Sequence, residues 1–204
     1  MTIDTINSID TISTIDTIDP IATINTIATI NIHLMQDNNQ EMFPIVDEEG
    51  NIVSAATRGE CHGGSKLLHP VVHLHLFNSK GEIYLQKRPE WKDIQPGKWD
   101  TAVGGHIDLG ESVSQALIRE VREELGIRLD EAPTPLAHYV FESDRERELV
   151  FVHKLIHDGE VCPSDELDGG RFWTKEELEA SIGKQVFTPN FESEYLRFEK
   201  VLSK

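Results

Sequence analysis

The pattern of apolar and polar positions divides the chain near residue 35. From Ile3 to Ile30, isoleucine recurs at every third position. This spacing fits neither the two-residue alternation of a strand nor the helical period of about 3.6 residues, so the repeat presents no single apolar face. We therefore expect residues 1–34 to be a low-complexity segment, either disordered or a misassigned start ahead of Met35. Residues 35–204 then form the folded domain.

The remaining chain mixes strand-like and helix-like patterns. Between positions 71 and 77, apolar residues alternate with His73 and His75, which predicts a strand in which these histidines have no special role. Further strands are predicted at 43–46 paired with 52–53, at 83–85, at 99–103 and at 149–156. Helices are predicted at 112–125, from a capping box that begins at Thr174, and over Phe191, Tyr195 and Phe198. Strands and helices without strict alternation predict an α/β fold with helices packed on a mixed sheet.

The stretch from Gly105 to Ile127, GHIDLGESVSQALIREVREELGI, contains an amphipathic helix. Its apolar stripe recurs at every fourth position, through Val113, Leu117, Val121 and Leu125. This spacing places the four side chains on one face, which we expect to contact the core. Gly126 follows the last of them, at a position where glycine readily adopts the left-handed backbone that ends a helix.

Carboxylates crowd the same helix. Glu120 and Glu124 are one turn apart and point the same way, and Glu123 lies between them in sequence. Because Glu124 falls at the apolar stripe, repulsion and partial burial both raise the cost of its charge. Arg119 can neutralise one carboxylate, and a hard divalent cation such as Mg²⁺ can neutralise the others through oxygen ligands. A solvated acidic helix face is the alternative.

The whole stretch resembles the Nudix box, a glycine, arginine and glutamate pattern. The matching positions are Gly105, Glu111, Arg119, Glu120, Val121, Glu123, Glu124, Gly126 and Ile127. This resemblance implies a Nudix-type α/β/α sandwich with Mg²⁺ or Mn²⁺ at the helix. The implied catalytic and metal-binding groups are Arg119, Glu120, Glu123, Glu124 and a backbone carbonyl near Gly105. Glu111 would pair with Arg119 and hold the loop, with Gly105 and Gly126 as structural glycines.

A wider resemblance, from about residue 62 to residue 190, is to type 1 isopentenyl-diphosphate isomerase and the hydrolases that branch near it. In those isomerases a separate metal site uses histidines and glutamates, and the matching positions are His62, His69, His106, Glu146 and Glu148. Arg88 and Lys92 match cationic positions that grip diphosphate oxygens. The alternatives are that the histidines are ordinary strand residues, that 145–148 is a charged loop, and that Arg88 and Lys92 are solvated.

Two departures favour hydrolysis over isomerisation. Gly104 stands where the isomerase has its catalytic cysteine, and neither Cys61 nor Cys162 lies at that place. Asn190 stands where the isomerase has a tryptophan. The resemblance thus implies a metal-dependent hydrolase that cleaves a diphosphate bond in a nucleoside diphosphate derivative or another small phosphorylated metabolite. An isomerase-like enzyme and a non-catalytic ligand sensor remain as alternatives.

Charge and composition narrow the partners. A formal net charge of -17 opposes binding to a nucleic-acid polymer, and a bound cation would reverse the local field for an anionic substrate. No apolar run is long enough to span a membrane, and no secretory signal begins the chain. Two cysteines make no disulfide framework. We expect a cytoplasmic protein with a small phosphorylated substrate and no membrane partner, and we leave a homodimer open.

Overall fold

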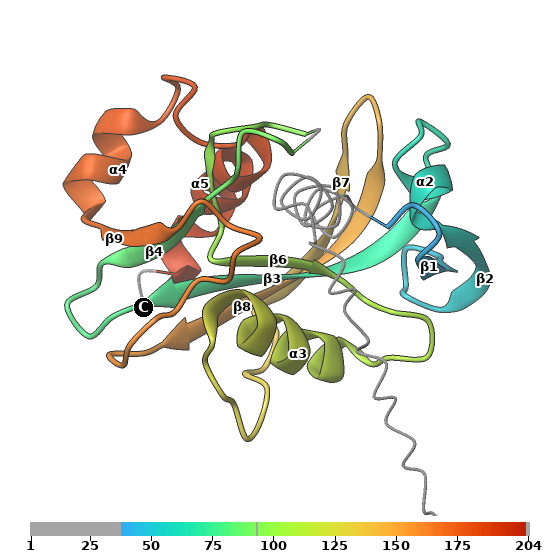
Figure 1. Cartoon of the computed structure of the whole chain (residues 1–204), viewed down its shortest axis with the longest axis horizontal. Coiled ribbons are helices and arrows are strands. Elements are labelled where there is room, and N and C mark those ends of the chain that lie inside the picture. The colour runs from blue at the N-terminus through green and yellow to red at the C-terminus, as the bar shows by residue number, and fades with distance from the viewer. Residues whose placement is uncertain (1–37, 93, 203–204) are drawn as a thin grey trace, which may run out of the picture. The chain divides into compact units, whose positions relative to one another are not determined.

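The computed structural model describes residues 38–92 and 94–202 (Figure 1). The low-complexity segment 1–34 lies outside the described residues, so its expected disorder or misassignment stays a prediction. No helix within the described ranges is long and apolar enough to cross a membrane.

A mixed sheet forms the centre of the described domain. Its strands are β3 (Leu68–Phe77), β4 (Ile83–Lys87), β5 (Trp99–Asp100), β6 (Val103–His106), β7 (Ala137–Glu142), β8 (Arg147–Ile156) and β9 (Gly170–Trp173). The main order is β5-β4-β3-β8-β7, with β6 paired to β3 and β9 paired to β4. Strands β3 and β8 are parallel, whereas the other pairs are antiparallel. The predicted mixed sheet is confirmed.

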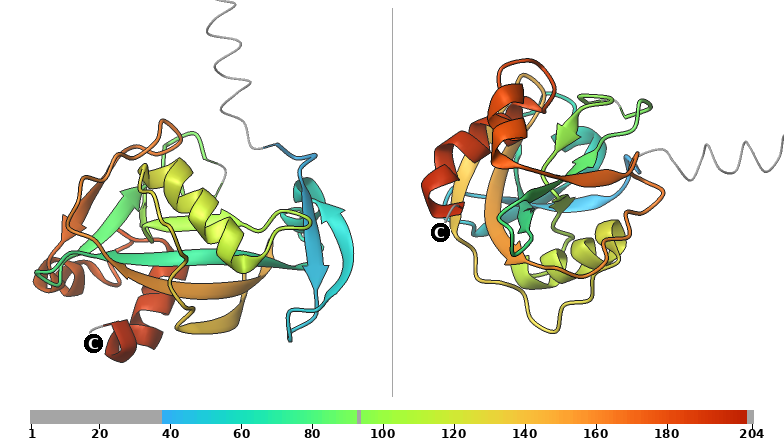
Figure 2. Two further views of the ribbon diagram at one scale, coloured as in Figure 1. Left: turned by 90° about the horizontal axis from the view of Figure 1, so that it is seen from below. Right: turned by 90° about the vertical axis from the view of Figure 1, so that its left-hand side faces the viewer.

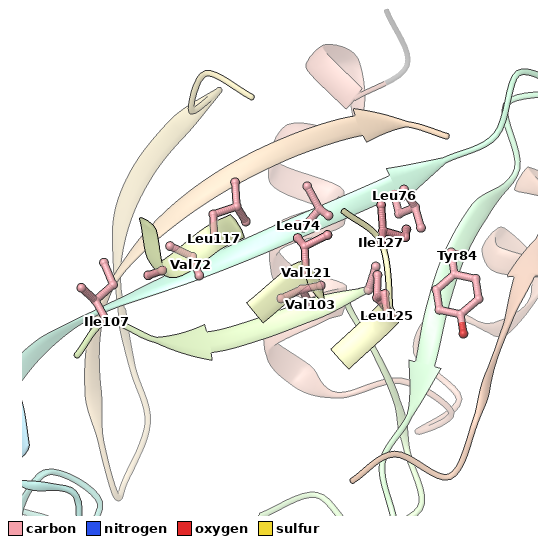
Figure 3. Close-up of a cluster of buried hydrophobic side chains, with 12 residues drawn as sticks. Val72, Leu74, Leu76, Tyr84, Val103, Ile107, Leu117, Val121, Leu125 and Ile127 are labelled. Carbon is pink, nitrogen blue, oxygen red and sulfur yellow. The ribbon is translucent and has the colours of Figure 1, made fainter. Parts of the chain in front are cut away.

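Helices cover both faces of this sheet, as Figures 1 and 2 show. On one face α3 (Val113–Leu125) packs against β3, where Leu117, Val121 and Leu125 meet the apolar side of the strand (Figure 3). On the other face α5 (Pro189–Leu202) packs through Phe191 and Tyr195. The two layers of helix around a sheet confirm the predicted α/β/α arrangement.

The remaining elements are shorter. The hairpin of β1 (Met42–Val46) and β2 (Ile52–Thr57) is confirmed as a separate two-stranded sheet, followed by α2 (Arg58–Cys61). Helix α4 (Lys175–Ser181) begins at the predicted capping box, in which the Thr174 side chain accepts from the Glu177 amide. Helices α3 and α5 also form where they were predicted.

Helix α3 has strong signals at both ends. The Ser112 side chain accepts from the Gln115 amide, and the Gln115 side chain accepts from the Ser112 amide in return. These reciprocal bonds satisfy two backbone donors that a helix start otherwise leaves unpaired. Gly126 ends the helix with φ of 68°, in the left-handed region that favours glycine. The ends of α3 therefore fix where its carboxylates stand.

The predicted single strand over 99–103 is wrong. The chain pairs with β4 as β5, turns at Thr101, and then pairs with β3 as β6. The Thr101 hydroxyl donates to the Leu74 carbonyl at 3.0 Å, which anchors the chain as it changes partner. Apolar content alone did not reveal this change of partner. Strands β7 and β9 and helix α2 were not predicted, since each is short or only partly buried.

Candidate functional site

Strand β6 contains two neighbouring glycines, Gly104 and Gly105. Among the described residues β6 pairs only with β3, and its Gly104 backbone amide donates to the Glu124 carboxylate. Side chains alternate along a strand, which turns Gly105 toward α3 and Gly104 toward the opposite face. A Cβ on Gly105 would lie 2.1 Å from the carboxyl carbon of Glu120. Any larger residue there would therefore displace this glutamate.

The carboxylates of α3 gather beside these glycines. Glu120 accepts from the Arg119 guanidinium at 2.8 Å, and Glu124 accepts from the Gln86 side chain at 3.2 Å. Burial raises the pKa of Glu124 to about 8, and the neighbouring Glu120 adds to this rise. Burial likewise raises the pKa of Glu120 to about 7, against the opposing effect of Arg119. The Glu123 side chain is half exposed, at 50%.

Arg119 ties the loop before α3 to the helix. Its Nε and Nη2 atoms donate to the two carboxylate oxygens of Glu111 at 2.9 and 2.8 Å. Nη2 also donates to the His106 carbonyl at 3.0 Å. Although burial acts to raise the pKa of Glu111, these bonds from Arg119 outweigh it and lower the pKa. One guanidinium thus fixes the loop, the end of β6 and the Glu120 carboxylate together.

A second cluster lies on the opposite face. Ligand atoms of His62, His69 and His106 all lie within 4.8 Å of one another, and the Nε2 atoms of His62 and His106 are 3.0 Å apart. Nδ1 of His69 bonds the Leu67 carbonyl at 3.0 Å, which makes it the protonated nitrogen. Nε2 of His69 then keeps its lone pair, and this buried atom has no hydrogen-bond partner among the described residues. A metal ion would satisfy such a nitrogen.

Two buried carboxylates stand beside these histidines. Glu146 and Glu148 are each 8% exposed, so the interpretation of 145–148 as a solvated charged loop is wrong. The Glu146 carboxylate lies 3.5 Å from Nδ1 of His62. Burial raises the pKa of Glu148 to about 8, and the charge of Glu146 adds to this effect. Burial lowers the pKa of His69, which keeps this imidazole neutral, the form that binds metals.

The two cationic residues singled out in the sequence have different surroundings: Arg88 acts electrostatically on Glu146, and Lys92 acts on both clusters. Nε and Nη2 of Arg88 donate to the Ile94 carbonyl at 3.1 and 2.9 Å, and Nη1 donates to Asp100 at 3.3 Å. Arg88 is therefore held in its loop, and its side chain is 25% exposed. The Lys92 ammonium is close enough to act electrostatically on both Glu124 and His106.

Sequence reasoning missed a third group, because it took His73 and His75 as ordinary strand residues. Glu194 of α5 is fully buried and accepts from Nδ1 of His73 at 3.0 Å and Nε2 of His75 at 2.6 Å. The Tyr139 hydroxyl donates to the same carboxylate at 2.8 Å. Burial alone would lower the pKa of His73, but the Glu194 charge outweighs it and raises the pKa to about 9. A glutamate inside the apolar stripe of the last helix was the available signal.

The raised pKa values of Glu120 and Glu124 predict how pH affects the metal-free protein. Between the unperturbed value of 4.5 and the folded values near 7 and 8, the folded state binds more protons than the unfolded state. The contribution of these two groups to the free energy of unfolding is therefore present at about pH 5 and declines as pH rises toward about 8.5. Glu124→Gln should melt higher than wild type at the upper pH in chelator, with a smaller difference at the lower pH.

Thermal unfolding followed by circular dichroism measures this difference. Glu179→Gln is the matched control, because that helical carboxylate is 56% exposed and far from α3 in sequence. It should melt like wild type at both pH values. Equal melting of Glu124→Gln and wild type at the upper pH would contradict the burial argument.

Comparisons with known proteins agree with this geometry. The sequence profile of the NUDIX domain matches residues 67–191. An uncharacterized Nudix hydrolase of Listeria monocytogenes is 38% identical over 126 residues, which cover 61% of this chain and 74% of that protein. Isopentenyl-diphosphate Delta-isomerase 1 of Photorhabdus laumondii is 31% identical over 113 residues, which cover 55% of this chain and 64% of the isomerase.

Solved structures give the same result for the fold. A crystal structure of a Deinococcus radiodurans protein has a TM-score of 0.66 at 27% identity, covering 77% of this chain and 98% of its own. The MutT protein of Methanosarcina mazei has a TM-score of 0.57 at 27% identity, covering 67% of this chain and 96% of its own.

Proposed function

Because this chain belongs to the Nudix family and is a Nudix hydrolase, we propose that it uses Mg²⁺ or Mn²⁺ to cleave a diphosphate bond. The substrate would be a nucleoside diphosphate derivative or another small phosphorylated metabolite. The observation that supports this most strongly is the largely buried pair of Glu120 and Glu124 beside the glycines of β6.

The donor set fits a hard divalent cation. Glu120 and Glu124 are like charges on one helix turn, and their burial makes both charges costly without a positive partner. These two carboxylates, Glu123 at the exposed rim and the Gly105 carbonyl would hold the ion, since oxygen atoms are its preferred ligands. When bound, the cation supplies a Lewis acid for the diphosphate and for a water molecule.

The chain's own residues position these groups. Arg119 orients the Glu120 carboxylate through one guanidinium bond while it holds the loop through Glu111. Gly105 lets this carboxylate approach the strand, because it has no side chain to displace it. Arg88 and Lys92 add positive charge at the site of a chain whose net charge is -17. We propose that they attract and hold the diphosphate oxygens.

A release assay tests the reaction and narrows the substrate. Phosphate and diphosphate release would be measured across nucleoside diphosphates, nucleotide sugars, dinucleotides and prenyl diphosphates, with Mg²⁺ and with Mn²⁺. We expect turnover of one of these classes that stops when a chelator is added. A protein that binds the cation but turns over none of them would support a non-catalytic sensor instead.

An isomerase-like reaction is the second candidate, favoured by the assembled histidine cluster. His62, His69 and His106 meet as a metal-ligand set, and we propose that they hold a second divalent cation together with Glu146 and Glu148. Gly104 and Asn190 nevertheless stand where the isomerase has a cysteine and a tryptophan. Incubation with isopentenyl diphosphate should therefore yield no dimethylallyl diphosphate by chromatography, and appearance of that product would favour the isomerase.

Arg88→Ala is expected to weaken substrate binding. The loss of one charge-assisted contact costs about 1.5–3 kcal/mol, which corresponds to roughly 10- to 150-fold. The measurement is KM on the best substrate from the release assay, with the melting temperature as a check on the fold. Lys80→Ala, at an exposed turn after β3, is the control for loss of one positive charge. A KM for Arg88→Ala equal to that of the control would show that Arg88 only holds its loop.

A further inference from the structure

His73 lies directly across the sheet ladder from Gly104. The antiparallel register of β3 and β6 pairs these two residues, and their side-chain positions share the face that carries the histidine cluster. A Cβ added to Gly104 would stand 3.8 Å from Nε2 and from Cδ2 of His73. Gly104 is exposed and has no side chain, so position 104 places no side chain over this edge of the imidazole ring. His73 itself is 8% exposed.

The opposite edge of the His73 ring is fixed by Glu194. This carboxylate is 0% exposed and accepts from His73 Nδ1 at 3.0 Å, from His75 Nε2 at 2.6 Å and from Tyr139. A fully buried carboxylate needs a positive partner, because an uncompensated charge in the interior is costly. One of the two histidines must therefore supply that charge.

The surroundings assign the positive charge to His73. Nδ1 of His75 is buried and has no partner among the described residues, so a proton on it would be an unsatisfied donor in the interior. His73 can carry the extra proton on Nε2, since that nitrogen lies next to the exposed Gly104 backbone. Because Nδ1 of His73 donates to Glu194, the remaining donor of this ring is Nε2–H, on the side of Gly104.

We propose that His73 is a substrate-binding residue whose Nε2–H donates to the diphosphate of the substrate above Gly104, and that Glu194 is the positioning residue that holds it. This inference rests on the proposed diphosphate chemistry. The neighbouring Gly105 lies against Glu120, so the donor of His73 and the α3 carboxylates approach the same short stretch of β6 from opposite faces. A diphosphate that extends around the edge of β6 that is not paired with β3 would place anionic oxygens on the side that His73 faces.

The side chain of position 73 offers two informative replacements. The amide nitrogen of asparagine overlays Nδ1 of histidine, so His73→Asn keeps the bond to Glu194 and removes the outer donor together with the positive charge. The amide nitrogen of glutamine overlays Nε2, so His73→Gln restores a donor at the outer position. His153 provides the matched control. It is 1% exposed, its Nδ1 bonds the Phe151 carbonyl at 3.0 Å, and its register with Leu74 places it on the α3 face.

The experiment is calorimetric binding of methylenediphosphonate, an analogue that resists hydrolysis, to the full chain in Mg²⁺. We expect His73→Asn to raise Kd about 10-fold, because a charge-assisted donor is lost. His73→Gln should recover part of that loss, and His153→Asn should bind like wild type. All three variants should have the circular dichroism spectrum of wild type. If one of them does not, Glu194→Gln takes its place in the comparison. Glu194→Gln should also weaken binding of the analogue.

Two negative results have different meanings. If wild type binds the analogue and His73→Asn binds it within about twofold of wild type, His73 has no role in binding, while the proposed function stands. If wild type does not bind the analogue with Mg²⁺ and turns over no diphosphate, the proposed function fails and the role of His73 fails with it. Equal weakening in His73→Asn and His153→Asn would reduce the effect to loss of a buried histidine and overturn the assignment.

Discussion

Glu120→Gln and Glu124→Gln are each expected to lower turnover by about 10³-fold or more, which corresponds to roughly 4 kcal/mol of lost transition-state stabilisation. Glutamine keeps the shape of the side chain but removes a charged oxygen ligand. The two carboxylates lie on one turn of α3, and burial leaves little water to screen their repulsion. The fold should survive, since each substitution relieves that repulsion. Steady-state kinetics on the best substrate measure the effect.

Controls separate this site from the histidine cluster. Glu179→Gln removes an exposed helical carboxylate and should leave turnover unchanged. His62→Ala and His69→Ala should cost much less than the glutamate changes if the reaction is hydrolysis at α3. If the histidine changes abolish diphosphatase activity and the glutamate changes do not, the reaction takes place at His62, His69 and His106. That result would also reopen the isomerase interpretation.

The parts of the site that were predictable depend on short separations in sequence. The spacing of Glu120 and Glu124 places both on one helix turn, and the position of Glu124 at the apolar stripe predicts that it is partly buried. Ser112 and Gly126 carry the start and stop signals of α3, and the structure places the ends of the helix there. A periodic pattern is enough for these features because each contact lies within a few residues.

Contacts between distant residues gave no such signal. His73 and Glu194 are 121 residues apart, and nothing in either local pattern indicates that α5 lies over β3. Glu146 and Glu148 look like part of a solvated loop in sequence, yet pairing of β8 with β3 places Glu148 opposite His69 in the interior of the sheet. Resemblance to a family indicated the cluster of His62, His69 and His106, whereas hydrophobic periodicity did not.

Arg119→Ala is expected to lower the free energy of unfolding by about 2–3 kcal/mol. Its guanidinium makes two bonds to Glu111 and one to Glu120, whose side chains are 16% and 14% exposed. Removing one partner of a buried ion pair costs about 3–5 kcal/mol because the remaining charge is uncompensated. Since the Arg119 side chain is 25% exposed, solvent screening reduces that figure. Urea unfolding at about pH 7 in chelator measures the loss.

Arg122→Ala is the matched control, because Arg122 lies on the same helix with a 61% exposed side chain, and among the described residues this side chain bonds only Glu123, at 3.2 Å. Arg122→Ala should lower the free energy of unfolding by no more than about 0.5 kcal/mol. Arg119→Lys keeps the charge but cannot reproduce the planar fork that spans both oxygens of Glu111, so an intermediate loss is expected. Equal losses for Arg119→Ala and Arg122→Ala would mean that solvent already compensates Glu111 and Glu120. The carboxylates of α3 would then need no cation to balance them, and the main physical argument for a metal at this helix would fail.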